Sequence, residues 1–546
     1  METAAKINGH LFAKMLQAGY ANLRAHAQTI NDLNVFPIPD GDTGDNMLLT
    51  LYGGMEAAGD GTDSIGETTR LVADAMLLSA RGNSGVILSQ IFEGIAQGLS
   101  GVTEADQDSL RFALRRGAMQ AYRAVLQPTE GTMLTVVRHL AERAAETKTA
   151  DIKALFEFWM EEAKIILEKT PEFLPVLKKA GVVDSGGAGL LCINEGMFAA
   201  YSGTYTADGL PTTPDVAEPI KPSVDFERFN EHSTLEFGYC TELLLRLLCA
   251  KCDPGIFDVT EIINAVTPLG DSIAATKSGS IVRLHIHTMN PGDVLNQCRR
   301  WGEFLQVKIE NMSLQHNSLS EKQEKTIPKE RRQYAVVAAA SGDGIKALFT
   351  ERGADVIVDG GQSANPSAED FLRAFEEACA GTIFVLPNNS NIILTAKQAA
   401  ELYQASDVRV IESRTIGEGY AALSMLSYES GDTDTIAAEL ADAMTGVVTA
   451  EISRCVRNTD EARAGDYIGF VGKEILAANE NRQRAVCDTA DRLIGDYDIC
   501  LILRGKDADP EETQKIEAYL TSRYPAKEIY LSDGLQEIYD YVLILE

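Results

Sequence analysis

Apolar residues recur at intervals of three and four positions through most of the first 205 residues, and this period predicts amphipathic helices. The clearest repeats lie in the segments "LFAKMLQAGYANLRAHAQTIND", "MLLTLYGGMEAA", "GVILSQIFEGIAQGL", "LRFALRRGAMQAYRAV", "MLTVVRHLAERAAE" and "IKALFEFWMEEAKIILEKT". Several predicted helices start directly after a small polar cluster with glycine, as happens before Met47, Val86, Met133 and Leu190. We therefore predict an all-α domain over residues 1–205.

The pattern changes after two polar segments that contain proline, residues 206–222 and 319–333, which we interpret as linkers. Between them, "STLEFGYCTELLLRLLC" predicts a strand that runs into a helix, and "SIVRLHIHTMNPGDVLNQCRRWG" predicts a strand, a turn and a helix. Residues 223–318 are therefore expected to form an α+β middle domain. Strands and helices alternate over residues 334–546, which predicts an α/β domain of two related lobes with largely parallel sheets.

The charge of the chain excludes two classes of partner. The sequence has 80 acidic and 49 basic residues and a formal net charge of −31, which is unsuited to binding nucleic acid or an anionic membrane. A phosphate ligand therefore needs local cations or backbone N–H groups. Because there is no signal-peptide core and no apolar run of bilayer-spanning length, and because nine cysteines are scattered through the chain, we expect a cytoplasmic protein without an integral membrane segment.

Three carboxylates, Asp40, Asp42 and Asp45, lie within six positions of each other in "PDGDTGDN". Like charges this close repel one another unless a cation lies between them, and Mg²⁺ prefers carboxylate oxygens together with substrate phosphates. A calcium EF-hand is excluded because the twelfth position counted from Asp40 is Leu51 instead of glutamate. A P-loop is excluded because its motif does not occur in the chain.

The glycine-containing clusters have two explanations. For any single cluster, glycine with Ser, Thr, Asp or Asn at a helix start is first of all a capping signal. Four such clusters in one helical domain favour a second explanation, because helix starts present unpaired N–H groups and a positive dipole end that suit phosphate. If the four starts converge, they form a nucleotide site at one end of the helical domain.

A second metal site is suggested by "RLHIHT" in the middle domain. On a strand His285 and His287 share one face, and two imidazoles with Cys240 as a third ligand suit Zn²⁺. From spacing alone, ordinary half-buried histidines remain an open alternative.

Four motifs in the helical domain together resemble a known family. "LNVFPIPDGDTGDNM", "SARGNSGVILSQ", "EGTMLTVVR" and "GVVDSGGAGL", in this order, resemble the ATP-binding DhaL (DAK2) domain of dihydroxyacetone kinases. The form with "PIPDGDTG" is similar to the N-terminal domain of FakA, the catalytic component of the bacterial fatty acid kinase. The resemblance implies an eight-helix barrel that holds ATP and two Mg²⁺ at one end.

The resemblance also implies roles for individual residues. It makes Asp40, Asp42 and Asp45 the catalytic metal carboxylates. It assigns contacts with the nucleotide and its phosphates to Asn34, Thr43, Asn46, Asn83, Ser84, Gly85, Thr132, Met133, Asp184, Ser185 and Gly186. Dihydroxyacetone kinases have their first metal aspartate where this chain has Asn34, and the third carboxylate here is Asp45, which favours the fatty acid kinase branch.

The resemblance extends beyond the helical domain. In the middle domain its Cys, His and His positions match Cys240, His285 and His287, which implies one Zn²⁺. The loops "GGQSANPSAEDF" and "LPNNSN" follow predicted strands of the C-terminal domain and resemble segments of DegV-like proteins. The carboxyl ends of such strands are usual positions for ligands or partners, although simple turn formation explains each loop equally well.

Three functions compete on this basis. The first is a kinase of lipid metabolism that phosphorylates the carboxylate of a fatty acid carried by a separate DegV-like (FakB) protein, with this chain as a homodimer. The second is a dihydroxyacetone (glycerone) kinase-like enzyme for a small ketone or polyol, and the third is a nucleotide-binding scaffold without turnover. Dihydroxyacetone kinases hold their substrate through a histidine in an α/β domain, but all seven histidines here lie at or before His316.

The domains are expected to divide the work. Residues 1–205 show no evident apolar pocket for an acyl chain, so the substrate is expected to come from outside. We expect residues 1–205 to contain the ATP site and residues 334–546 to dock the carrier.

Overall fold

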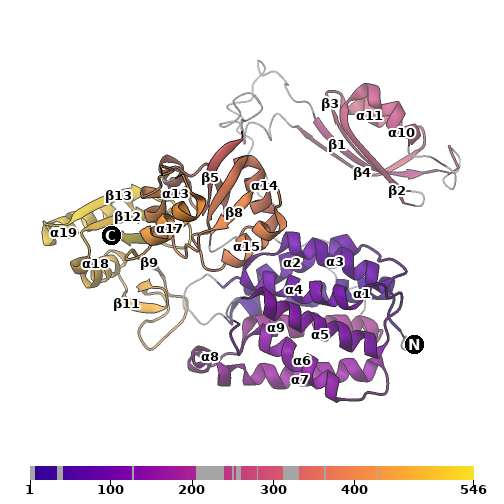
Figure 1. Cartoon of the computed structure of the whole chain (residues 1–546), viewed down its shortest axis with the longest axis horizontal. Coiled ribbons are helices and arrows are strands. Elements are labelled where there is room, and N and C mark those ends of the chain that lie inside the picture. Colours follow the sequence, from indigo (N-terminus) through magenta and orange to yellow (C-terminus); the bar gives the residue numbers. More distant parts are fainter. Residues whose placement is uncertain are drawn as a thin grey trace. The chain divides into compact units, whose positions relative to one another are not determined.

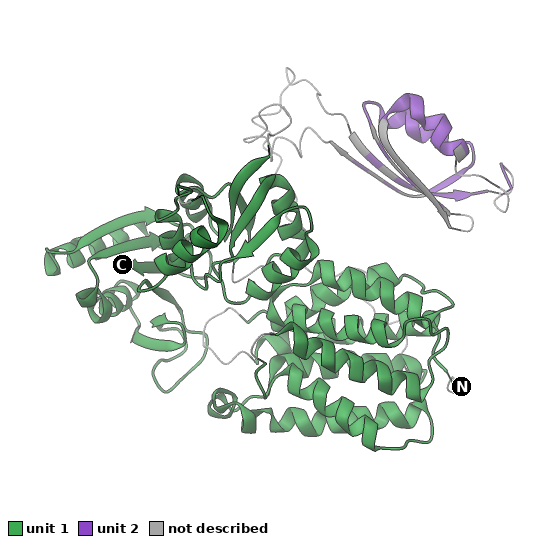
Figure 2. Cartoon of the chain, viewed as in Figure 1, with its two compact units in different colours: residues 1–210, 330–546 green, residues 211–329 purple. Residues whose placement is uncertain are grey.

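The computed structural model forms two compact units, which are described separately (Figure 2). One contains residues 1–210 with 330–546, and the other contains residues 211–329. The structure describes residues 6–33, 41–125, 128–204, 239–248, 251–253, 257, 260–278, 281–311, 331–361, 365–429 and 431–546. Among these residues, no helix is both long enough and apolar enough to cross a bilayer.

The N-terminal domain is entirely helical in its described residues (Figure 1). Its helices are α1 (Gly9–Asn31), α2 (Thr43–Ala58), α3 (Ile65–Ser79), α4 (Gly82–Gly98), α5 (Gln107–Ala124), α6 (Met133–Glu146), α7 (Ile152–Phe173), α8 (Pro175–Ala180) and α9 (Ser185–Tyr201). The expected count of eight is therefore wrong for the described residues, which contain nine helices. The additional helix, α8, has six residues and begins at Pro175, because proline fits the first helical turn, where its missing N–H breaks no bond.

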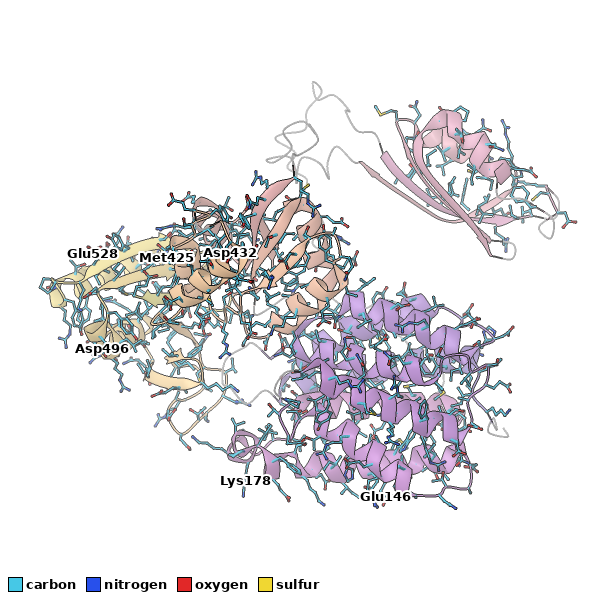
Figure 3. The ribbon with its side chains drawn as sticks, in the orientation of Figure 1. Glu146, Lys178, Met425, Asp432, Asp496 and Glu528 are labelled. Carbon is cyan, nitrogen blue, oxygen red and sulfur yellow. The ribbon has the colours of Figure 1, made fainter. Side chains whose placement is uncertain are left out.

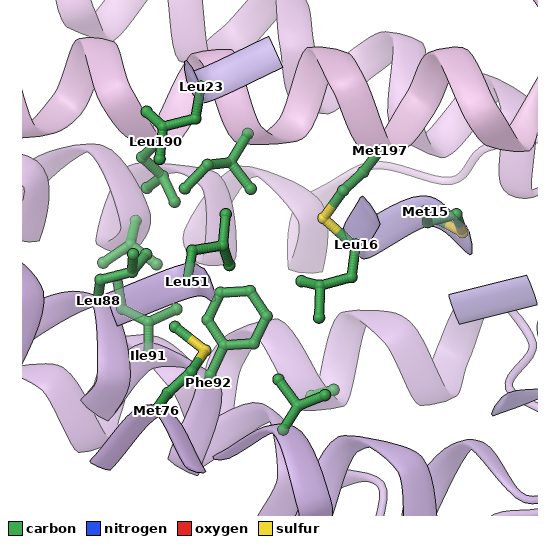
Figure 4. Close-up of a cluster of buried hydrophobic side chains, with 14 of the residues drawn as sticks. Met15, Leu16, Leu23, Leu51, Met76, Leu88, Ile91, Phe92, Leu190 and Met197 are labelled. Carbon is green, nitrogen blue, oxygen red and sulfur yellow. The ribbon is translucent and has the colours of Figure 1, made fainter. Parts of the chain in front are cut away.

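The helices enclose one apolar core, part of which Figure 4 shows. Leu16, Leu51 and Phe92, from three different helices, are each at most 5% exposed and meet there. Burying one such side chain contributes roughly 1.5–3 kcal/mol, so this core can hold the first turns of its helices in fixed positions.

Three of the four marked helices begin earlier than the sequence suggests. Helices were expected to start at Met47, Val86 and Leu190, but α2, α4 and α9 begin at Thr43, Gly82 and Ser185. Only α6 begins at the expected residue, Met133. The polar glycine-containing clusters are therefore mostly the first helical turns themselves, which exposes their own N–H groups to the site.

The second unit contains one antiparallel sheet with the order β2-β3-β1-β4. Its elements are β1 (Tyr239–Leu247), α10 (Thr260–Val266), β2 (Asp271–Ser278), β3 (Ile281–Thr288), α11 (Pro291–Cys298) and β4 (Gly302–Asn311). The helix expected within "ELLLRLL" is wrong, because β1 continues to Leu247. Leu243, Leu245 and Leu247 are buried while Arg246 is exposed, and this alternation is the pattern of a strand.

The first lobe of the C-terminal domain confirms the predicted parallel sheet. Its order is β6-β5-β7-β8, and all three pairings are parallel. The elements are β5 (Arg332–Ala340), α13 (Asp343–Glu351), β6 (Val356–Asp359), α14 (Ala368–Ala378), β7 (Ala380–Leu386), α15 (Ile393–Leu402) and β8 (Asp407–Val410). Two further helices follow, α16 (Ile416–Ser424) and α17 (Thr433–Ala443). Asp432 (Figure 3) caps α17, because its carboxylate accepts the Thr435 N–H at 3.0 Å.

The second lobe corrects the expectation of largely parallel sheets. Its sheet has the order β11-β10-β9-β14-β12-β13, and only β12 and β13 pair in parallel. The elements are β9 (Val448–Arg454), β10 (Tyr467–Val471), β11 (Glu474–Asn479), α18 (Arg482–Leu493), β12 (Ile499–Arg504), α19 (Pro510–Arg523), β13 (Glu528–Asp533) and β14 (Tyr541–Leu545). Antiparallel pairing arises where the chain reverses between β9 and β10, where it reverses again at a tight turn at Gly472 with φ +58°, and where β14 returns between β9 and β12.

Candidate functional site

The first turns of three helices are joined at one end of the helical domain. The Ser185 hydroxyl of α9 hydrogen-bonds to the Thr43 hydroxyl of α2 at 3.2 Å. Asp184 caps α9 by accepting the Gly187 N–H at 2.7 Å, and it also accepts the backbone N–H of Met133, the first residue of α6. The starts of α2, α6 and α9 are therefore linked by direct hydrogen bonds.

The start of α4 approaches α2 at the same end. Gly82 has φ +57°, and a Cβ there would lie 2.5 Å from Asn46 Nδ2, so the close approach requires glycine. The Arg81 N–H donates to the Thr50 hydroxyl at 3.2 Å. The four helix starts marked in the sequence thus converge, and their unpaired N–H groups and positive dipole ends suit a phosphate chain.

Asn31 positions one of the predicted metal carboxylates. It lies at the end of α1, is 7% exposed, and donates from Nδ2 to Asp45 Oδ2 at 2.9 Å. Its Oδ1 accepts the Gly44 N–H at 2.7 Å, so the same side chain fixes the start of α2. Sequence analysis did not identify Asn31 as a partner of Asp45. The only available signal was its place near the end of a predicted helix, six residues before "PIPDGD".

The structure brings most residues of the predicted ATP site together. At the four helix starts lie Asp42, Thr43, Asp45, Asn46, Asn83, Ser84, Gly85, Thr132, Met133, Asp184, Ser185 and Gly186. Thr132 caps α6 by accepting the Leu134 N–H at 3.4 Å. Asn34 and Asp40 lie outside the described residues, so the third metal carboxylate is not placed.

The oxygen donors at this end fit a hard cation such as Mg²⁺. Asp42 and Asp45 supply carboxylates, and Asn83 Oδ1 is a buried acceptor that has no partner among the described residues. A buried acceptor without a donor is costly, and a bound cation or ligand hydroxyl would satisfy it. Among the described side chains, no three His, Cys, Asp or Glu residues lie close enough together to hold a metal ion.

A residue of the C-terminal domain also reaches this site. Asn365 Nδ2 donates to Asp42 Oδ2 at 2.5 Å. A predicted metal carboxylate of the helical domain thus has a hydrogen-bond partner 323 positions further along the chain.

Burial raises the pKa of Asp184 to about 6, and the hydrogen bonds from Gly187 and Met133 lower it in part. The folded state therefore holds this proton more tightly than the unfolded chain, in which the pKa has its ordinary value of 3.8. The contribution of this carboxyl to stability consequently falls as the pH rises from about 4 to about 6, and it is constant above that range.

Asp184→Asn should separate this effect from capping, since asparagine can still accept the Gly187 N–H but cannot ionise. We expect the variant's stability relative to the native chain to increase by about 1 kcal/mol between pH 5 and pH 7.5. Urea unfolding without nucleotide, followed by the fluorescence of Trp159 in a Trp301→Phe background, measures this difference. A difference that does not vary with pH would show that the carboxyl does not titrate in this range.

The strand register of the middle domain supports the proposed zinc positions. Cys240 on β1 is directly opposite His287 on β3, and His285 lies two residues from His287. The three positions therefore adjoin on one face of the sheet. Their side chains lie outside the described part of the structure, so no ligand geometry is stated.

We predict that these three positions bind one Zn²⁺ per chain. Elemental analysis of protein purified without chelator should find the metal, and His285→Ala should lose it, because two remaining ligands hold zinc weakly. Cys252→Ser is the matched control and should keep the metal, since the Cys252 thiol donates to the Trp301 carbonyl at 3.5 Å. Full zinc content in His285→Ala would place the ligands elsewhere.

The helical domain also contains an apolar cavity of about 90 Å³ within its core. Phe92, Trp159 and Met197 are among the side chains that line it. This cavity is smaller than one that holds a single benzene ring, so it does not accommodate a whole acyl chain.

Protein families and relatives match this chain over nearly its whole length. The DAK2 domain family matches residues 37–199, the middle domain of the FakA-like family of fatty acid kinases matches residues 236–319, and the C-terminal domain of the same FakA-like family matches residues 335–546. Protein YloV of Bacillus subtilis is 38% identical over 563 residues, which cover 99% of each chain. A Staphylococcus epidermidis protein is 35% identical over 556 residues, covering 99% of this chain and 100% of its own.

Two solved structures match a smaller part of this chain. DegV of Bacillus subtilis, a fatty acid binding protein, matches 39% of this chain and 99% of its own, with a TM-score of 0.31 and 14% identity. The fatty acid kinase B3 protein of Streptococcus pneumoniae, loaded with linoleic acid, matches 39% and 99%, with a TM-score of 0.29 and 12% identity. These scores are too low to establish a shared fold.

Proposed function

Because the chain belongs to the FakA-like family of fatty acid kinases, we propose that it is the ATP-dependent component that phosphorylates the carboxylate of a fatty acid. The observation that carries this proposal is the convergence of four helix starts beside Asp42 and Asp45. Backbone N–H groups and carboxylates at one place are what a metal-bound phosphate chain requires.

Each group of the chain has a separate task in this reaction. The N–H groups of Asn83 and Ser84 in the first turn of α4 are available to the phosphate oxygens, whereas the Gly85 N–H donates to the Arg81 carbonyl at 3.0 Å. Asp42 and Asp45, with Asp40, would hold two Mg²⁺, and Asn31 keeps Asp45 oriented. When bound, Mg²⁺ supplies positive charge that offsets the charge developing on the phosphates during transfer.

The reaction needs no strong general base in the chain. A fatty acid carboxylate is already a nucleophile, so its oxygen forms the new bond to the γ-phosphorus while the bond from that phosphorus to ADP breaks. The products are an acyl phosphate and ADP, and no proton has to be removed from the substrate. Positioning and electrostatics are then sufficient for catalysis.

The substrate is proposed to arrive on a separate DegV-like carrier protein of the FakB family. The cavity in the helical domain is too small for an acyl chain, and residues 334–546 contain no histidine that could tether a small ketone. We propose that residues 334–546 dock the carrier and that the middle domain, with its zinc, pairs two copies of the chain. The carrier keeps the apolar acyl chain out of water and presents its carboxylate to the site.

ADP release by the full-length chain tests the proposal against its alternatives. We expect release with a fatty acid-loaded carrier, little release with the empty carrier, and none with dihydroxyacetone. Release with dihydroxyacetone and no carrier would show a glycerone kinase-like enzyme instead. If ATP binds but no combination releases ADP, the chain is a nucleotide-binding scaffold.

A further inference from the structure

Residues 365–370 form backbone hydrogen bonds with the residues just before α4, and we name them the Asn365 segment. This segment follows β6 of the parallel sheet and leads into the start of α14, which Figure 1 labels. Arg81 forms an isolated antiparallel bridge with Ser367, and the Ala368 N–H donates to the Ala80 carbonyl at 3.3 Å. Two parts of the chain about 290 positions apart in sequence thus meet through their backbones.

Arg81 strengthens this contact with its side chain. Its guanidinium donates to the Asn365 carbonyl at 2.7 Å, and it lies 3.8 Å from the carboxylate of Asp370. Arg81 is also the N-cap residue of α4. The same residue therefore joins the predicted phosphate loop to the C-terminal domain.

The Asn365 segment is locally rigid. Ser367 and Asp370 form a reciprocal capping box at the start of α14, with hydrogen bonds of 2.8 to 3.2 Å. Pro366 restricts the backbone between that cap and Asn365. The side chain of Asn365 is consequently presented to the helical domain in a defined position.

Asn365 makes its side-chain contacts with the predicted metal site. It is only 2% exposed, and its Nδ2 donates to Asp42 Oδ2 at 2.5 Å and to Asn46 Oδ1 at 3.3 Å. Its Oδ1 is a buried acceptor without a partner among the described residues, as is Asn83 Oδ1. An unsatisfied acceptor on a residue that contacts the Asp42 carboxylate, and another in the first turn of α4, indicate a site built for a cation or a donor ligand.

The contact also helps to orient the carboxylate of Asp42. This residue is the N-cap of α2, but its side chain makes no capping hydrogen bond to that helix. The backbone of α2 therefore does not hold its carboxylate. By donating to Oδ2, the amide of Asn365 is one of the groups that orient this carboxylate.

We propose that Asn365 is a positioning residue that the C-terminal domain contributes to the Mg²⁺·ATP site through Asp42. The metal site is then fully formed only when the Asn365 segment is seated on α2 and α4. This inference rests on the proposed function, because it assumes that Asp42 binds the metal. Loss of a hydrogen-bond partner behind a metal ligand typically weakens metal affinity ten- to a hundredfold.

Gln398 provides a matched control at the same domain contact. It is 7% exposed, donates to the Leu77 carbonyl at 2.5 Å and accepts from Gln90 at 3.1 Å. It therefore joins the same two domains through partly buried hydrogen bonds, and within the described part of the chain none of these bonds involves a residue of the predicted ATP site. A purely structural role of the domain contact would make Gln398→Ala and Asn365→Ala behave alike.

The test compares Asn365→Ala with Gln398→Ala in the full-length chain. The first readout is the rise in melting temperature with a non-hydrolysable ATP analogue, measured at increasing Mg²⁺ concentrations. The Mg²⁺ concentration that gives half of the full rise is compared between variants, and this measurement needs no turnover. The second is the Mg²⁺ concentration that gives half-maximal ADP release with loaded carrier. We expect roughly a tenfold or larger increase for Asn365→Ala in both readouts, and a change within about twofold for Gln398→Ala.

Asn365→Leu preserves the volume of the side chain without the donor, and it replaces the alanine variant if that one does not fold. An increase confined to the Asn365 variants supports the proposal. No increase, or an equal increase in Gln398→Ala, overturns it. If the native chain releases no ADP with any substrate, the proposed function fails, but stabilisation by Mg²⁺ and the analogue still decides the role of Asn365.

Discussion

Asp42→Asn is expected to remove phosphoryl transfer while leaving the fold intact. The side chain makes no capping hydrogen bond to α2, so loss of its charge should cost the helix only the dipole interaction, about 0.3–1 kcal/mol. Replacing one carboxylate by a neutral amide in a metal site should cost several kcal/mol of transition-state stabilisation, which corresponds to roughly a thousandfold loss of rate. ADP release with loaded carrier measures the loss, and thermal unfolding without ligand verifies the fold.

Asp63→Asn is the control for this prediction. Its carboxylate lies in the same helical domain, 98% exposed and 3.3 Å from His10, so the substitution removes one charge without touching the site. Full activity is expected from the control. Nearly normal activity of Asp42→Asn at ordinary Mg²⁺ concentrations would refute the metal role of Asp42.

Removing residues 334–546 is expected to end carrier-dependent phosphorylation while ATP still binds. The helical domain has its own apolar core, which includes Leu16, Leu51 and Phe92, so it should remain folded without the C-terminal domain. From the sequence alone, ATP binding is expected to be nearly unchanged. The contact between Asn365 and Asp42 alters that expectation, and the fragment should need about tenfold more Mg²⁺ to bind the ATP analogue.

Two measurements on the fragment check this prediction. Far-UV circular dichroism verifies that the helices persist, and titration with the analogue at several Mg²⁺ concentrations gives the metal requirement. Phosphorylation of carrier-bound fatty acid at the full-length rate would contradict docking through the C-terminal domain. An unchanged Mg²⁺ requirement would contradict only the part played by Asn365.

Local patterns predicted the helical domain well. Buried residues such as Leu16, Leu23 and Ile30 recur along α1 at helical spacing, and this signal needs no knowledge of distant contacts. The start of α2 was placed four residues late because its first turn carries polar residues such as Asp45, which the apolar repeat does not include. The same polar first turn contributes Asp45 and Asn46 to the predicted ATP site.

Strands were harder to predict where apolar residues form a run. The leucines from Leu243 to Leu247 fit either a helix or a strand, and only the backbone pairing of β1 with β3 and β4 decides for the strand. The antiparallel second sheet depends on β14, the last strand of the chain, which inserts between β9 and β12. No local pattern specifies such a long-range pairing.

In the predicted site too, short-range features could be predicted from the sequence and long-range contacts could not. Glycine-containing clusters identified the four helix starts, because capping and phosphate binding use the same short-range chemistry. Asn31 and Asn365 were missed as partners of Asp45 and Asp42, since each contact depends on tertiary packing. The loop "GGQSANPSAEDF" was predicted to be a ligand or partner position, but nothing in its sequence indicates that it contacts Asp42.

Detection of the acyl phosphate tests the central claim most directly. The full-length chain is incubated with ATP, Mg²⁺ and a carrier protein loaded with a fatty acid, and hydroxylamine is added to trap any acyl phosphate as a hydroxamate. We predict a fatty acyl hydroxamate in an amount equal to the ADP released, and none with Asp42→Asn. ADP release without hydroxamate, or a phosphorylated ketone or polyol as the product, would contradict the proposed function.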